Sequence, residues 1–226
     1  MLLLAADTSG KHGSIALARS GPDEECHILE VVPLAGGTFS AQLVPQIAAL
    51  LAKHEFSKQD IGGFAVVSGP GSFTGLRVGL AAIKALAEVL TKPIAAVSLL
   101  EAVAVSGRAK GKVVAALDAG RAEVYIGEYE VEGTAAQLLS QRLVTRSEFI
   151  FIATAWACIV VTPDPGLAEA ARTAALPLEQ IELPQADVIA RLGWGKIQVG
   201  QTISPDELDA NYIRRSDAEI FSKTIP

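Results

Sequence analysis

An apolar hairpin opens the chain and decides the fold: residues 2–7 read LLLAAD, residues 8–12 read TSGKH and residues 13–19 read GSIALAR. Two apolar runs around a short polar turn predict two antiparallel strands. The first run has no positive residues before it and passes straight into Asp7. We therefore interpret it as a strand of the folded domain and not as a signal peptide.

The turn after the first strand is a candidate phosphate site. Asp7 ends a buried strand, and Thr8 and Ser9 follow it with small hydroxyl side chains. Backbone N–H groups and hydroxyls in such a turn can donate to a phosphate while the carboxylate holds a metal ion through water. The alternative is an Asx-type turn, in which the aspartate caps its own backbone.

A glycine-rich loop follows a short predicted strand. Residues 68–77 read SGPGSFTGLR and open a helix that we predict over residues 72–90. Glycines at a helix N-terminus can bind an anion, but the loop matches neither the Walker A nor the GxGxxG pattern. Gly71, Gly75 and Gly79 leave a bare stripe along the helix, and each interior glycine costs about 1 kcal/mol relative to alanine. The stripe favours close packing, within the chain or with a partner, over phosphate binding.

The apolar pattern then restarts, which predicts an α/β fold in two halves. Residues 113–118 and 123–130 flank the turn Ala119-Gly120-Arg121, so Asp118 ends its strand as Asp7 ends the first one. We place the domains at residues 1–106 and 107–203, with a C-terminal extension over residues 204–226. The other expected elements are strands over residues 28–32, 64–67, 94–97, 138–144 and 158–161 and helices over residues 42–54, 99–105, 167–173 and 188–199.

Composition limits the functions open to this chain. Its 226 residues are half hydrophobic, and 19 Lys and Arg against 25 Asp and Glu give a net charge of -6. A stand-alone nucleic-acid binder would carry a basic face, so that class is not expected. Cys26 and Cys158 lie far apart and the three histidines lack zinc-ligand spacing, which argues against a disulfide scaffold and a metal-dependent hydrolase. No apolar run reaches the roughly 20 residues of a membrane span, and we expect a soluble cytoplasmic protein.

Four segments together resemble the bacterial TsaB family, also called YeaZ. They are LLAADTS at residues 3–9, SGPGSFTGLRVGLAAIKALA at residues 68–87, LDAGRAEVY at residues 117–125 and NYIRR at residues 211–215. The GPGSFTGLR stretch is the most specific of these. Two departures from the family pattern are Phe39-Ser40, where members often carry His before Ser, and residues 118–123, which read DAGRAE in place of DARRGE.

The resemblance implies the two-lobed, ribonuclease H-like fold of the actin, Hsp70 and sugar-kinase ATPase superfamily, with a reduced second lobe. It implies a non-catalytic subunit for synthesis of tRNA N6-threonylcarbamoyladenosine (t6A), which binds and activates a TsaD-type transferase subunit. A TsaE-type ATPase would join the assembly, tRNA would be met only through the complex, and ATP or ADP with Mg would act in that wider complex. No cofactor and no membrane contact is assigned to this chain.

The resemblance also implies which residues carry the function. Two first-lobe helices, about residues 40–54 and 73–90, would pair with the TsaD-type subunit or with a second copy of the chain. The implied interface residues are Ser40, Leu43, Val44, Ile47, Leu51, Phe73, Thr74, Leu76, Arg77, Leu80 and Lys84. The implied remnants of two phosphate-binding hairpins are Asp7, Thr8, Ser9, Asp118 and Arg121, with no catalytic residue and no metal ligand.

Other functions remain open at this point. The two aspartate hairpins and the glycine loop also suit an independent Mg-ATP-dependent ATPase or a small-molecule kinase. A glycoprotein-directed peptidase, a function attached to relatives of this fold, is disfavoured by the missing metal-ligand spacing. Trp194 and the pair Arg214-Arg215 are further contact candidates, against the alternatives of a packed aromatic and a solvated basic pair.

Overall fold

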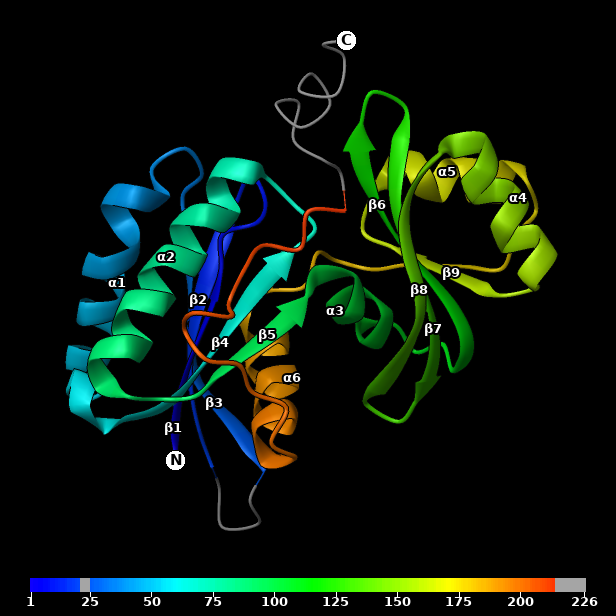
Figure 1. Cartoon of the computed structure of the whole chain (residues 1–226). Coiled ribbons are helices and arrows are strands. Elements are labelled where there is room, and N and C mark those ends of the chain that lie inside the picture. The colour runs from blue at the N-terminus through cyan, green and yellow to red at the C-terminus, as the bar shows by residue number, and fades with distance from the viewer. Residues whose placement is uncertain (21–24, 214–226) are drawn as a thin grey trace, which may run out of the picture. The chain divides into compact units, whose positions relative to one another are not determined.

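The computed structural model describes residues 1–20 and 25–213, which divide into two compact units (Figure 1). The first unit consists of Met1–Ala102 together with Leu183–Ala210. The second consists of Val103–Glu182 and, among the described residues at the C-terminal end, residues 211–213. Each unit is built on its own five-stranded mixed sheet.

The first sheet has the order β3-β2-β1-β4-β5, with β1 at its centre. β1 pairs antiparallel with β2 and parallel with β4, and all six of its residues are buried. Helices α1 and α2 cover one face of the sheet and α6 covers the other (Figure 1), so the central strand is apolar on both sides. The strands are β1 (Leu2–Asp7), β2 (Gly13–Ser20), β3 (Cys26–Leu34), β4 (Ile61–Gly69) and β5 (Ile94–Ser98). The helices are α1 (Phe39–Lys53), η1 (Lys58–Asp60), α2 (Phe73–Leu90) and α6 (Ala186–Gln198).

The second sheet has the order β10-β9-β6-β7-β8 and repeats the local arrangement of the first. β6 pairs antiparallel with β7 and parallel with β9, as β1 does with β2 and β4. Its core packs strand residues such as Val114 and Val160 against Phe149 of α4 and Leu167 of α5. The elements are β6 (Gly111–Gly120), β7 (Glu123–Glu132), β8 (Ala135–Thr145), α4 (Arg146–Trp156), β9 (Ile159–Thr162), α5 (Pro165–Thr173) and β10 (Leu178–Gln180). Helix α3 (Leu99–Ser106) spans the border between the two units.

The observed elements confirm the prediction of an α/β fold in two halves but differ from it in several places. The short elements η1 and β10 were not predicted. Helix α1 begins at Phe39, three residues before the expected start, and carries Pro45 inside it. Helix α4 was not predicted, because its apolar residues run on into β9 without helical contrast. Helix α6, which the sequence analysis placed in the second domain, packs on β1, β2, β4 and β5 of the first unit. Arg214 and Arg215 lie outside the described residues.

Candidate functional site

The turn Asp7–Thr8–Ser9 is closed by its own hydrogen bonds. All three residues are buried. Asp7 Oδ1 accepts a 2.8 Å bond from Ser9 N and a 2.6 Å bond from Ser9 Oγ, which is the Asx-type turn. Burial raises the pKa of the Asp7 carboxyl, and the two bonds from Ser9 act in the opposite direction.

The glycine stripe of α2 lies against this turn. A Cβ at Gly75 would overlap the carbonyl oxygen of Thr8, and a Cβ at Gly71 would lie 2.5 Å from the carbonyl oxygen of Ser9. Two hydrogen bonds join the surfaces: Thr8 Oγ1 donates to Gly75 O at 2.8 Å, and Ser72 N donates to Ser9 O at 2.6 Å. The stripe therefore serves close packing within the chain. The Thr8 and Ser9 hydroxyls and Ser9 N all donate within the protein, as the Asx-type alternative predicts.

The second hairpin places Asp118 at an exposed turn. Asp118 N donates to Asp164 Oδ2 at 2.7 Å, and Arg146 Nη2 lies 3.8 Å from Asp118 Oδ1. Arg121 and Ala122 both take positive φ angles, of 55° and 61°, at the tip. Burial raises the pKa of the Asp164 carboxyl; the bond from Asp118 N lowers it, and the Asp118 charge raises it further. Asp7 and Asp118 thus belong to different units, and their surroundings differ.

The predicted interface residues divide into two groups in the structure. Five of them are buried against the first unit's own core: Leu43, Ile47, Leu51, Leu76 and Leu80. They form the apolar stripes by which two amphipathic helices pack on a sheet, so their side chains are core residues and not surface contacts. This corrects the sequence interpretation of these five.

The other six predicted residues lie on the outer side of the two helices. Ser40, Val44, Phe73, Thr74 and Arg77 are exposed, with Val44 at 54% and Phe73 at 41%, and Lys84 is half-buried. The Arg77 guanidinium lies 3.6 Å from the centre of the Phe73 ring, within cation–π distance. Small side chains occupy six further exposed positions, namely Ala41, Ala48, Ala49, Ala52, Ala81 and Ala85. The other exposed residues of the two helices are Pro45, Lys53, Glu88 and Val89. We call these exposed residues of the two helices the α1–α2 face.

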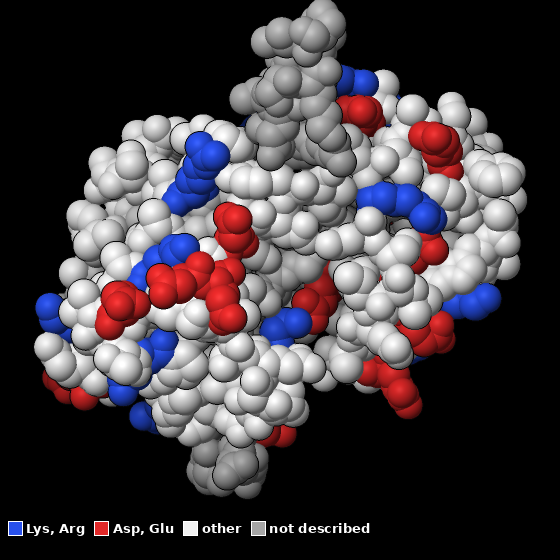
Figure 2. All heavy atoms as spheres, in the orientation of Figure 1, with Lys and Arg blue, Asp and Glu red and all other residues white. Residues whose placement is uncertain are grey.

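The α1–α2 face carries little charge. Lys53, Arg77, Lys84 and Glu88 are the charged residues of the two helices. Figure 2 shows few charged side chains over α1 and the first half of α2, at the upper left of the view. Exposed apolar and small residues with few charges are typical of the centre of a protein interface.

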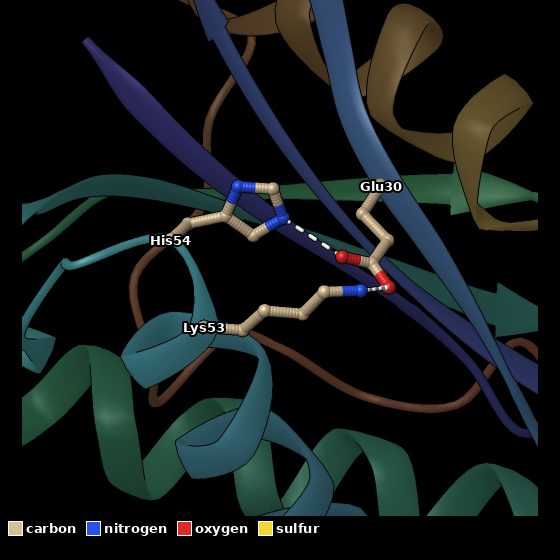
Figure 3. A network of polar contacts seen from close by, with 3 residues as sticks. All are labelled: Glu30, Lys53 and His54. Carbon is tan, nitrogen blue, oxygen red and sulfur yellow. Dashed lines mark hydrogen bonds and ion pairs between the residues drawn. The ribbon is translucent and has the colours of Figure 1, made fainter.

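A network of polar contacts fixes the C-terminal end of α1 to strand β3 (Figure 3). Lys53 Nζ lies 2.7 Å from Glu30 Oε1, and His54 Nε2 lies 2.8 Å from Glu30 Oε2. The hydrogen bond from Lys53, and then that from His54, lowers the pKa of the Glu30 carboxyl, while burial raises it. Sequence reasoning missed this site, because nothing in the sequence relates Glu30 to residues more than twenty positions further on.

The ion pairs of Glu30 should make the stability of the chain depend on pH. The folded-state pKa of Glu30 lies below the unfolded value, so its stabilisation is present above the unfolded pKa and is lost as pH falls through the folded one. Glu30→Gln should therefore lower the Tm at pH 7, and the gap from wild type should close as pH falls below about 4. Thermal melts from pH 3 to 7 measure this. Glu55→Gln, near the same helix end, is the control, and its Tm should not differ from that of wild type. A Tm difference between Glu30→Gln and wild type that grows in acid would contradict the assignment.

Two features are not seen in the described part of the chain. Across residues 1–20 and 25–213, no group of three or more His, Cys, Asp and Glu could hold a metal ion. No helix in the same ranges is long and apolar enough to cross a membrane. Cys26 and Cys158 are both free thiols, and burial raises the pKa of Cys158 to about 11.

Two mixed sheets, each with an antiparallel hairpin beside a parallel strand, define the ribonuclease H-like α/β class that includes actin and Hsp70. Comparison with known proteins identifies a family within this class. The family model described as TsaD, tRNA N6-adenosine threonylcarbamoyltransferase, matches residues 31–155. The solved structure of YeaZ from Pseudomonas aeruginosa matches with a TM-score of 0.75 and 25% identity, covering 93% of this chain and 99% of that one.

Two curated relatives carry the description "tRNA threonylcarbamoyladenosine biosynthesis protein TsaB". The Bacillus subtilis protein is 38% identical over 131 residues, 58% of this chain and 56% of the relative, so the match spans about half of that relative's length. The Escherichia coli protein is 28% identical over 236 aligned residues, 96% of each chain. The chain belongs to the TsaB (YeaZ) family, which confirms the resemblance seen in the sequence.

Proposed function

We propose that this chain is a non-catalytic partner subunit in t6A synthesis, which binds and activates a TsaD-type transferase through the α1–α2 face. The description of its relatives supports the pathway. The observation that carries the proposed role is the face itself, because exposed small and apolar side chains extend along two neighbouring helices with little charge.

Physical reasons favour a helix-on-helix contact at this face. Alanine and serine side chains are short, so the helices of a partner can approach closely and pack without voids. Phe73 with Arg77 stacked on it supplies the aromatic and guanidinium anchor pair that is common at the centre of interfaces. The buried stripe below, including Leu43 and Leu76, holds the face in place before a partner arrives.

The surroundings of Asp7 support a role without catalysis. The turn that would hold a metal-bound phosphate in an ATPase of this class packs against α2, and its Thr8 and Ser9 hydroxyls donate within the protein. The TsaD-type subunit would then carry the transfer chemistry, a TsaE-type ATPase would use the nucleotide, and tRNA would be met through the complex. A second copy of the chain could cover the same face when the TsaD-type subunit is absent, and the protein would act in the cytoplasm.

Reconstitution tests this proposal. The chain is mixed with the TsaD-type and TsaE-type proteins of the same organism, tRNA and the threonylcarbamate donor system, and t6A is measured by mass spectrometry of digested tRNA. We expect t6A only when the chain is present, and a complex with the TsaD-type subunit in size-exclusion chromatography with light scattering. Full t6A formation without the chain would refute the proposal. Mg-ATP hydrolysis by the chain alone would favour the ATPase alternative.

A further inference from the structure

We propose that Thr8 is a positioning residue for the α1–α2 face. The hairpin turn Asp7–Thr8–Ser9 packs against the inner side of the first turn of α2. It thereby determines the positions of Phe73, Thr74 and Arg77 on the exposed side. The expected effect of Thr8 on binding of the TsaD-type subunit rests on the proposed function, whereas its expected effect on the stability of α2 does not.

The contacts from the hairpin converge on one helical turn. Thr8, which is 3% exposed, donates from Oγ1 to Gly75 O at 2.8 Å. Ser72 N donates to Ser9 O at 2.6 Å, and the side chain of Ser72 accepts from Gly75 N as the helix N-cap. Both ends of the first turn are therefore tied to the hairpin. Phe73, Thr74 and Arg77 lie on the opposite, exposed side of the helix, because helical positions three to four apart share a side.

The hairpin itself is held in one conformation. Asp7 Oδ1 accepts from both Ser9 N and Ser9 Oγ, which fixes the direction of the Ser9 carbonyl that receives Ser72 N. Both bonds end on the same carboxyl oxygen of Asp7, so the turn is held in one geometry. The hairpin contacts α2 through the Thr8 hydroxyl and the Ser9 carbonyl.

The fit between the hairpin and α2 leaves no room for a methyl group. A Cβ at Gly79 would overlap the Thr8 hydroxyl oxygen, while the other Thr8 atoms would lie at ordinary contact distances of 3.6 and 3.7 Å. A Cβ at Gly75 would instead overlap the backbone carbonyl of Thr8. Truncating the Thr8 side chain can therefore relieve the clash at Gly79 but not the clash at Gly75. Paired substitutions can test the contact for this reason.

The first test compares Thr8→Ala, Thr8→Ser and the control Thr162→Ala, in which a buried threonine hydroxyl of the second unit is removed. We expect Thr8→Ala to weaken binding of the TsaD-type subunit about tenfold in calorimetry. Amides of residues 73–79 should exchange at least tenfold faster, while those of residues 94–98 should stay unchanged. Thr8→Ser keeps the donor and should keep both properties, and Thr162→Ala should alter neither.

The second test adds Gly79→Ala and Gly75→Ala to wild type and to Thr8→Ala. Gly79→Ala should lower the Tm of wild type but raise that of Thr8→Ala, because the clash is gone and alanine favours the helix. Gly75→Ala should lower the Tm of both. Equal shifts for Gly79→Ala in the two backgrounds, or unchanged exchange in Thr8→Ala, would overturn the proposal. A wild-type chain that binds no TsaD-type subunit would reject the proposed function, while exchange and melting would still decide the role of Thr8.

Discussion

Replacing Ala81 by glutamate is expected to weaken binding of the TsaD-type subunit at least 100-fold and to leave the fold intact. Ala81 is exposed on α2, four residues after Arg77 and four before Ala85. Glutamate is a good helix former, so the free subunit should be as stable as wild type. In the complex its carboxylate would be buried in an apolar contact, which costs more than the roughly 2.7 kcal/mol that a 100-fold loss represents.

Calorimetric titration measures the affinity, and thermal melting followed by circular dichroism measures the fold. Ala155→Glu is the matched control, because Ala155 is also an exposed helical alanine but belongs to α4 of the second unit. It should bind as wild type does. If Ala81→Glu bound the TsaD-type subunit with unchanged affinity, the α1–α2 face would not be the interface.

The neighbouring residue shows why the choice of position matters. Leu80 is only 5% exposed and lies on the inner stripe of α2. A glutamate there would lose about 1.5–3 kcal/mol of apolar burial and add the cost of an unpaired buried charge. That sum approaches the whole stability of a typical domain, so we expect unfolding of the first unit in urea or heat. Loss of partner binding by Leu80→Glu would therefore not identify an interface.

The sequence predicted the apolar stripes of α1 and α2 but not what they contact. A helix that packs on its own sheet and a helix that packs on a partner show the same spacing of leucines, as Leu43 and Leu76 illustrate. Alanine is the most frequent exposed residue of the proposed partner face, and alanines stand out neither as apolar nor as polar. Only the location of the sheet in three dimensions distinguishes the two sides.

The hairpin was predictable for a simple reason. β1 is buried on both faces, so its sequence is a continuous apolar run, and the polar turn after Asp7 interrupts it clearly. The sequence of the turn could not show its contact with Gly75 and Gly79, because these glycines lie about seventy residues further on. The sequence favoured close packing for the glycines without identifying their neighbour, which the structure shows to be Thr8 and Ser9.

The sequence did not reveal which of the two sheets α6 packs on. Its apolar positions predict a helix near the C-terminal end, and position in the chain suggested the second domain. The structure packs it on the first sheet, where Ser14 Oγ accepts a 2.9 Å bond from Ala186 N and Lys196 Nζ lies 3.1 Å from Glu101 Oε2. These partners are far away in sequence, so no local pattern could have revealed the return of the chain to the first sheet.

Replacing Gly193 of α6 by alanine is expected to cost up to about 2 kcal/mol of stability. A Cβ at Gly193 would overlap that of Ala65 on β4, and both residues are buried. Overpacking of this kind costs about 1–3 kcal/mol and exceeds the gain in helix propensity. Gly195→Ala, two residues further along the same helix with no atom within 4 Å of its Cβ, should instead gain up to about 1 kcal/mol.

The pair Gly193→Ala with Ala65→Gly tests the contact directly. Removing the Ala65 methyl leaves the new Cβ at 3.4 Å from the Ala65 Cα and 3.5 Å from the Ala95 Cβ, both tolerable distances. The double variant should therefore be more stable than the sum of the two single changes predicts, by at least 1 kcal/mol in urea unfolding. Strict additivity would mean that α6 does not cross the first sheet at Ala65, and the assignment of this helix to the first unit would then be wrong.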